Sequence, residues 1–230
     1  MRLKRRSISL IGVTFALAFV LWALAAAPMV ARAVEFLLLP GIGTVTVSNM
    51  LVEGFDQMEA WERYNSASGA QLGVENGIYR IFSANPGYVW GLNSQAYADT
   101  VTEVQVTPLT SFQDIGSGVM CRADASNNGD GYYFMISANG YYSIRIGRGS
   151  EVAPLIDWSL SSAVKYGIDQ NTIRAVCMGN QLAMYVNDQL VANIVDNTYS
   201  SGYTGLTAAA STNGVDVSFD NLKLYAIQVQ

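Results

Sequence analysis

Residues Tyr132–Ile146 read YYFMISANGYYSIRI, two runs of aromatic and β-branched residues joined by a turn, which is the pattern of a β-hairpin. A two-residue turn at Asn139-Gly140 would mix polar and apolar side chains on both faces. A three-residue turn, with Gly140 left-handed, pairs Ser137 with Tyr141 and separates the faces. One face then carries Tyr132, Phe134, Ile136, Tyr142, Ile144 and Ile146, and the other carries Tyr133, Met135, Ser137, Tyr141, Ser143 and Arg145.

A second hairpin is predicted over Thr172–Val186, where Gly179-Asn180 suits a two-residue type II′ turn with glycine first. One face then carries Ile173, Ala175, Cys177, Leu182, Met184 and Val186, and the other carries Arg174, Val176, Met178, Gln181, Ala183 and Tyr185. Each hairpin is therefore expected to have one core face and one face that bears tyrosine and arginine.

The same rhythm of short apolar runs and Gly, Asn, Asp or Ser turns continues from Gln71 onward at intervals of about ten residues, which favours an all-β sandwich. A short helical turn is expected at Ser159–Gly167. The 230 residues are 50% hydrophobic and 13% charged, and they show no repeat or low-complexity linker, so one folded domain is expected.

The N-terminus has the pattern of an export signal. A basic start, Met1–Arg6, precedes the uncharged stretch Ser7–Val30 and then Ala31-Arg32-Ala33, which suits cleavage ahead of Val34. Twenty-four helical residues would reach about 36 Å, enough to cross a bilayer core of about 30 Å. Residues 1–33 are thus either a signal peptide or one apolar transmembrane helix, with the domain outside the cytoplasm.

Composition excludes several classes of function. All 18 acidic residues follow Ala33, whereas five of the 13 basic ones precede Val34, so the exported part carries a net charge of −10 and repels nucleic acid. Histidine is absent, which excludes Ser-His-Asp, Cys-His and histidine-metal chemistry. Cys121 and Cys177 are the only two cysteines; export and the inward direction that the turn registers give them predict a disulfide.

Several stretches together resemble one fold family in their order and spacing. They are Gly54-Phe55-Asp56 with Trp61, Val74–Tyr79, Gly118–Arg122, Gly131–Phe134, Asn171–Asn180, Leu182–Asn187, Gly205-Leu206 and Phe219–Leu222. They resemble the concanavalin A-like lectin/glucanase sandwiches of the laminin-G-like sort, common as exported domains of bacterial proteins, over about Gly54–Tyr225. The resemblance implies a two-sheet jelly roll over residues 54–230, with roles from sugar binding and glycoside hydrolysis to protein adhesion. Residues 34–53 fall outside it and are either a membrane-proximal segment or an extra strand.

No catalytic residue is predicted. Hydrolases of this fold carry alternating carboxylates on one strand, because alternate residues share a face. The nearest candidates here, Glu53, Asp56, Glu59 and Glu62, are spaced by three and would point to opposite faces. A solvated loop with Phe55 and Trp61 in the core is expected instead, and a degenerate glycoside hydrolase ranks last among the functions.

No metal or cofactor is predicted, and calcium is the alternative. Asp124, Ser126, Asn128 and Asp130 resemble the first half of a calcium loop, but Met135 stands where a bidentate Glu would complete it. An Asn/Gly-rich turn is therefore favoured. Trp90 suits either a sugar platform or the core, and Trp158, which follows Leu155-Ile156, is expected in the core.

A ligand face is predicted on the sides of the two hairpins that point away from the core. Its residues are Tyr133, Tyr141, Arg145, Arg174, Tyr185 and Arg122, whose residue types anchor many interfaces. The alternative is that ordinary cross-strand pairs cover the sheet there. The favoured function is an exported or membrane-tethered, non-enzymatic binding module for a glycan or a cell-surface protein. A structural subunit of a membrane assembly, held by its N-terminal helix, is the alternative.

Overall fold

The computed structural model describes residues 35–56, 61–124, 126 and 128–228, and every regular element in these ranges is a strand. Within the same ranges there is no helix of the length and hydropathy needed to cross a membrane. The predicted N-terminal helix lies outside the described residues. The helical turn expected at Ser159–Gly167 is not formed: the segment consists of the end of a strand followed by isolated turns, one of them closed by the bond from Val164 N to Ser161 O.

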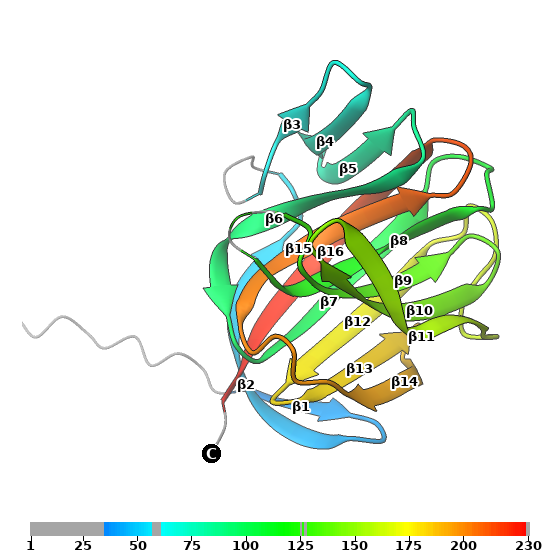
Figure 1. The fold of residues 1–230 in the computed structure, drawn as a ribbon. Helices are drawn as coiled ribbons and strands as arrows, with labels where there is room; N and C mark the ends of the chain where they lie inside the picture. The colour runs from blue at the N-terminus through cyan, green and yellow to red at the C-terminus, as the bar shows by residue number, and fades with distance from the viewer. Residues whose placement is uncertain (1–34, 57–60, 125, 127, 229–230) are drawn as a thin grey trace, which may run out of the picture. The chain divides into compact units, whose positions relative to one another are not determined.

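The strands form two antiparallel sheets that face each other, as Figure 1 shows. The ten-stranded sheet contains β1 (Glu35–Leu39), β2 (Gly43–Glu53), β3 (Tyr64–Asn65), β4 (Ala70–Glu75), β5 (Ile78–Ser83), β7 (Thr100–Pro108), β12 (Asn171–Met178), β13 (Gln181–Val186), β14 (Gln189–Val195) and β16 (Val215–Gln228). The six-stranded sheet contains β6 (Gly87–Tyr97), β8 (Ile115–Ala123), β9 (Gly131–Ser137), β10 (Tyr141–Arg148), β11 (Glu151–Leu160) and β15 (Gly202–Ala210).

In both sheets, strands that are neighbours in the sequence pair with each other and also with strands far away in the sequence. The main path of the larger sheet is β14-β13-β12-β7-β16-β5-β4-β3, and β2 joins it by pairing with β16. The smaller sheet runs β11-β10-β9-β8-β15-β6. The predicted all-β architecture of two antiparallel sheets is confirmed.

Both predicted hairpin registers are also confirmed. Arg145 lies opposite Tyr133 and Tyr142 opposite Ile136, the register that follows from pairing Ser137 with Tyr141, and Gly140 has a φ of +92°. In the second hairpin Met178 lies opposite Gln181, as a two-residue loop requires.

The core fills the space between the sheets with the residues that alternation points inward, including both predicted core faces. Phe55 and Trp61 lie in this core, as expected, and their rings contact Tyr79 with centroids 5.7 and 5.6 Å from its ring. The predicted disulfide between Cys121 on β8 and Cys177 on β12 is present, so a covalent bond joins the two sheets.

Residues 35–53 form the β1–β2 hairpin, which covers part of the outer face of the ten-stranded sheet. Leu39 packs there with Val176, Ala183 and Tyr185, and the Tyr185 hydroxyl donates to the Pro40 carbonyl at 2.8 Å. This sheet is therefore covered on its outer side near β12 and β13.

Candidate functional site

The two hairpins that carry the predicted ligand face lie in different sheets. β9 and β10 belong to the six-stranded sheet, whereas β12 and β13 belong to the ten-stranded sheet. Their outward faces therefore point to opposite sides of the sandwich. The structure does not bring Tyr133 and Arg145 together with Arg174 and Tyr185, so the single surface expected from the sequence does not exist.

The predicted tyrosines differ in exposure. Tyr133 and Tyr185 are both 0% exposed, and burial raises the pKa of each. The Tyr133 hydroxyl donates to Gly129 O at 2.6 Å, so its hydrogen-bonding capacity is used inside the domain. Only Tyr141 is both on the outward face and partly accessible.

Two of the predicted arginines hold the fold together. Arg122 is buried and donates to the carbonyls of Ala98 and Tyr199 at 2.9 and 2.8 Å, and it pairs with Asp99 at 3.0 Å. It is also one of the few non-glycine residues with positive φ, +53°. The Arg122 side chain therefore stabilises the fold by linking β8 to the segments around Ala98 and Tyr199.

Arg174 has a similar role on the outer side of the ten-stranded sheet. Its guanidinium contacts Glu103 at 2.6 Å and Asp188 at 2.8 Å, and it lies 5.6 Å from the centroid of the Tyr185 ring. These contacts are ordinary cross-strand pairs, the predicted alternative to a ligand face.

A groove of about 460 Å³ lies at one end of the outer face of the six-stranded sheet, and we call it the cross-strand groove. It is lined by Tyr88, Gln113, Asp114, Ile115, Gly116, Ser137, Asn139, Tyr141, Trp158, Ala209, Ala210 and Ser211. These residues come from all six strands and from the loops that join them. The strands can be followed in Figure 1.

Register explains why this end of the sheet is hollow. Tyr88 lies opposite Ala209, Ala209 opposite Gly116, and Gly116 opposite Ser137, so these residues form one row across four strands with their side chains on the same face. Tyr141 extends the row on β10. The middle of the row has small side chains and its two ends have aromatic ones.

Trp158 forms part of this groove, and the expectation that it lies in the core is wrong. Its side chain is 37% exposed. A side chain atom added at Gly116 would lie 3.3 Å from Trp158 Cη2, so the indole extends over the glycine in the groove floor.

An extra residue in β11 explains the direction of Trp158. Ile156 lies opposite Ile144 and Ser159 opposite Tyr142, so β11 takes three steps where β10 takes two. Such a bulge reverses the alternation of side chains. Ser159 therefore faces the core side, and Trp158 points outward.

Arg145 supports Trp158 from the neighbouring strand. Its guanidinium carbon lies 5.9 Å from the centroid of the indole ring, while Nη1 donates to Ser143 Oγ at 3.3 Å and Nη2 to Val152 O at 3.4 Å. Contact with an arginine cation at this distance favours a fixed orientation of the indole. Of the predicted ligand residues, Tyr141 and Arg145 are thus the two that the structure associates with the groove.

Asp114 is the one carboxylate among the described residues that line the cross-strand groove. The Thr212 hydroxyl, with help from Ser211, lowers its pKa to about 2. It is therefore an ionised hydrogen-bond acceptor at neutral pH and not a proton donor.

Two of the acidic residues that the sequence singled out, Glu53 and Glu62, lie outside the groove and accept hydrogen bonds from the backbone. Glu53 accepts from Phe55 N at 2.9 Å, and Glu62 accepts from Leu92 N at 3.0 Å. Glu59 lies outside the described residues.

The candidate calcium residues accept hydrogen bonds from backbone groups of their own loop and of the turn between β10 and β11. Asp124 accepts from Ser126 N at 2.8 Å, Asn128 accepts from Asp130 N at 2.9 Å, and Asp130 accepts from Gly149 N. The first two are the side chain to backbone bonds of Asx turns, and the third joins the loop to the turn that follows β10. In the described part of the chain, no three His, Cys, Asp or Glu side chains come close enough to hold a metal ion.

Some groove residues were not identified from the sequence. Tyr88, Gly116 and Ala209 come from strands far apart in the chain, and only their pairing brings them into one row. The sequence contains one local signal for them: Tyr88 and Trp90 are two residues apart, as are Gly116 and Gly118, so each pair shares one face of its strand.

Comparison with known proteins identifies the fold. No family model matches the sequence, and no curated protein matches it either. Solved structures do match, and they are jelly-roll sandwiches of the concanavalin A-like kind. The carbohydrate binding module CBM66 from Bacillus subtilis is 18% identical, with a TM-score of 0.58 over 72% of this chain and 95% of that one.

Two other similar structures have different printed descriptions. The β-glucanase of Bacillus licheniformis is 14% identical, with a TM-score of 0.56 over 77% of this chain and 98% of that one. The exoplasmic/lumenal domain of VIP36, in a form bound to Ca²⁺ and Man3GlcNAc, is 12% identical, with a TM-score of 0.55 over 78% of this chain and 89% of that one. At these identities the likeness shows the fold alone.

Proposed function

We propose that this protein is a glycan-binding module that holds an uncharged oligosaccharide in the cross-strand groove. The observation that carries the proposal is the row of small side chains between aromatic ones, from Tyr88 to Trp158. Neighbouring strands lie about 4.8 Å apart, so six strands span roughly 24 Å. A groove of that reach accommodates several sugar rings.

The chemistry of the lining suits such a ligand. Aromatic faces pack against the apolar faces of sugar rings, and Asn139, Ser137 and Asp114 offer hydrogen-bonding groups for hydroxyls. A pocket that is mainly apolar with a few polar groups is typical of small-molecule sites. Similar structures include a carbohydrate binding module and a domain with a bound oligosaccharide, which also supports the proposal.

Binding without hydrolysis is the form of the proposal that the groove favours. Glycoside hydrolases use two carboxyl groups about 5–10 Å apart, one of which must be protonated. Among the described residues the groove is lined by one carboxylate, whose pKa of about 2 keeps it ionised. Because glucanases also have this fold, release of reducing sugar is measured alongside binding.

We further propose that the domain works outside the cytoplasm. The disulfide between Cys121 and Cys177 supports this, because such bonds persist in oxidising compartments. The charge pattern of Met1–Arg6 followed by an uncharged stretch supports export as well.

Affinity electrophoresis with neutral β-glucans, mannans, galactans and fructans tests the function. At least one polysaccharide is expected to retard the protein, and Trp158→Ala is expected to weaken that binding tenfold or more, about 1.4 kcal/mol. Phe36→Ala, which removes an exposed aromatic side chain on β1 of the other sheet, serves as the control and should bind normally. Retardation by none of these polymers, or equal retardation of the Trp158→Ala variant, would refute the proposal.

A further inference from the structure

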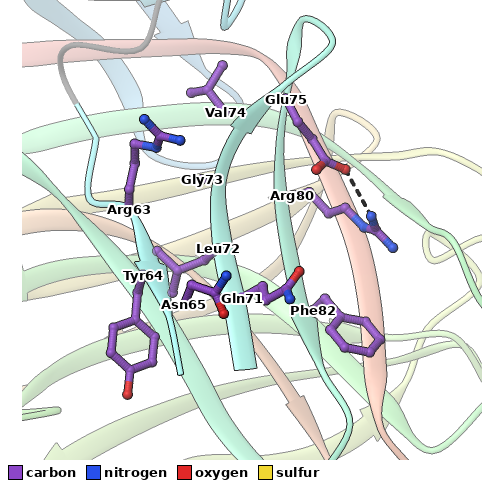
Figure 2. Close-up of a pocket in the computed structure, with 10 residues that line it drawn as sticks. All are labelled: Arg63, Tyr64, Asn65, Gln71, Leu72, Gly73, Val74, Glu75, Arg80 and Phe82. Atoms are coloured by element: carbon purple, nitrogen blue, oxygen red, sulfur yellow. Dashed lines mark hydrogen bonds and ion pairs between the residues drawn. The ribbon is translucent and has the colours of Figure 1, made fainter. Parts of the chain in front are cut away.

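A second groove, of about 440 Å³, lies on the ten-stranded sheet over β3, β4 and β5. Figure 2 shows its lining, with Arg63 on one side of Gly73 and the Glu75–Arg80 pair on the other. It shares no lining residue with the cross-strand groove and belongs to the other sheet. We call it the β4 groove.

The hollow in the β4 groove exists because Gly73 has no side chain. Gln71, Gly73 and Glu75 point outward in alternation on β4, so the glycine leaves a gap between two polar residues. Its φ of +151° is one that residues with a Cβ rarely adopt. An added Cβ would lie 3.4 Å from Arg63 Cγ, so the stem of Arg63 lies against the glycine.

The two arginines beside the gap differ in their partners. Arg80 donates two bonds to Asp216, at 2.7 and 2.6 Å, and one to Glu75 at 2.9 Å, and these carboxylates raise its pKa further. Its charge is therefore already compensated. Arg63 makes no hydrogen bond or ion pair with any residue that the structure describes.

Arg63 is distinct in this respect among the basic side chains of the described ranges. The others all bond within the domain: Arg80, Arg122, Arg145, Arg148, Lys165, Arg174 and Lys223. In a domain with a strong excess of acidic residues, a guanidinium left exposed beside a hollow is available to an external carboxylate.

The rest of the lining offers groups for hydroxyls and for an apolar ring face. Asn65 lies opposite Gln71, and Gln71 opposite Phe82, so two exposed amides and an aromatic side chain stand in one row next to the guanidinium. Amides both donate and accept hydrogen bonds, which matches pairs of sugar hydroxyls.

From these groups we propose that the β4 groove binds an acidic saccharide, with the carboxylate of a uronic acid residue paired to Arg63. Asn65 and Gln71 then contact its hydroxyls, and Phe82 packs against the ring. Arg63, Arg80, Glu75 and Asp216 together carry no net charge, so the groove suits one carboxylate and not a phosphate polymer. This site goes beyond the proposed function, because its ligand class and its residues both differ from those of the cross-strand groove.

Isothermal titration with oligomers of galacturonate, glucuronate and mannuronate, each compared with its methyl ester, tests the proposal. At least one acid is expected to bind, its methyl ester at least tenfold more weakly, and Arg63→Gln is expected to reduce affinity for the acid tenfold or more. Arg63→Lys should restore part of the affinity, because charge returns without the planar guanidinium.

Trp158→Ala separates the two grooves, since it should leave binding of the acid unchanged while it removes binding of a neutral polysaccharide. Failure of all three acids to bind, equal affinity for acid and ester, or normal affinity of the Arg63→Gln variant would each overturn the β4 groove as a uronate site. None of these results bears on the cross-strand groove, which is tested with uncharged ligands.

Discussion

Replacing Cys121 and Cys177 with alanine removes the covalent bond between the two sheets. The bond closes a loop with a sequence separation of 56 residues. In the chain-entropy model a loop of that length stabilises the folded state by about 4 kcal/mol, because the unfolded chain loses freedom. For a domain of this size, that corresponds to a fall in melting temperature of roughly 8–16 °C.

Urea unfolding monitored by tryptophan fluorescence measures this change. Both single variants should lose nearly as much stability as the double variant, because either one breaks the same bond. Alkylation of the denatured, unreduced protein should label no cysteine in the wild type. A loss below about 1 kcal/mol in the double variant, or losses in the single variants that add up to it, would refute the chain-entropy reasoning.

Two further predictions concern charged groups. Arg122→Met should lower the free energy of unfolding by about 3–5 kcal/mol in urea titrations, because Asp99 and two carbonyls lose their buried partner. A loss under about 1 kcal/mol would show that these bonds do not stabilise the fold. The pKa of Asp114 is about 2 in the folded protein, below its ordinary value, so its stabilisation is present above about pH 4 and is lost as the pH falls towards 2. Asp114→Asn should flatten that part of the stability profile, and an unchanged profile between pH 4 and 2 would contradict the role of the Thr212 hydroxyl.

Local features of the fold were predictable from the sequence. The turn at Gly140 and the pair Gly179-Asn180 determine the registers of their hairpins, because turn length and alternation act within about fifteen residues. The disulfide was predictable because Cys121 and Cys177 are the only two cysteines of a domain expected to be exported, and the second register points Cys177 inward. These predictions needed no knowledge of which strands pair at long range.

The candidate ligand face failed because it depended on long-range pairing. Nothing within the two hairpins shows that they belong to different sheets, or that the β1–β2 hairpin covers Tyr185. The prediction that Trp158 lies in the core was wrong for another reason. A bulge in the edge strand β11 reverses the alternation of side chains, and the position of the bulge depends on the partner strand. The groove row from Tyr88 to Tyr141 likewise exists only once β6, β8, β9, β10 and β15 have paired.

Strand β16 affects the order in which the larger sheet can form during synthesis. It pairs with β7 along most of its length, with β5 at its start and with β2 at its end, so each of these three strands has β16 as one of its two neighbours. Ribosomes synthesise the other strands first, and until Val215–Gln228 has emerged β5 and β7 expose unpaired edges. The larger sheet can therefore become continuous only after β16 has been synthesised, whereas all six strands of the smaller sheet are already complete by then.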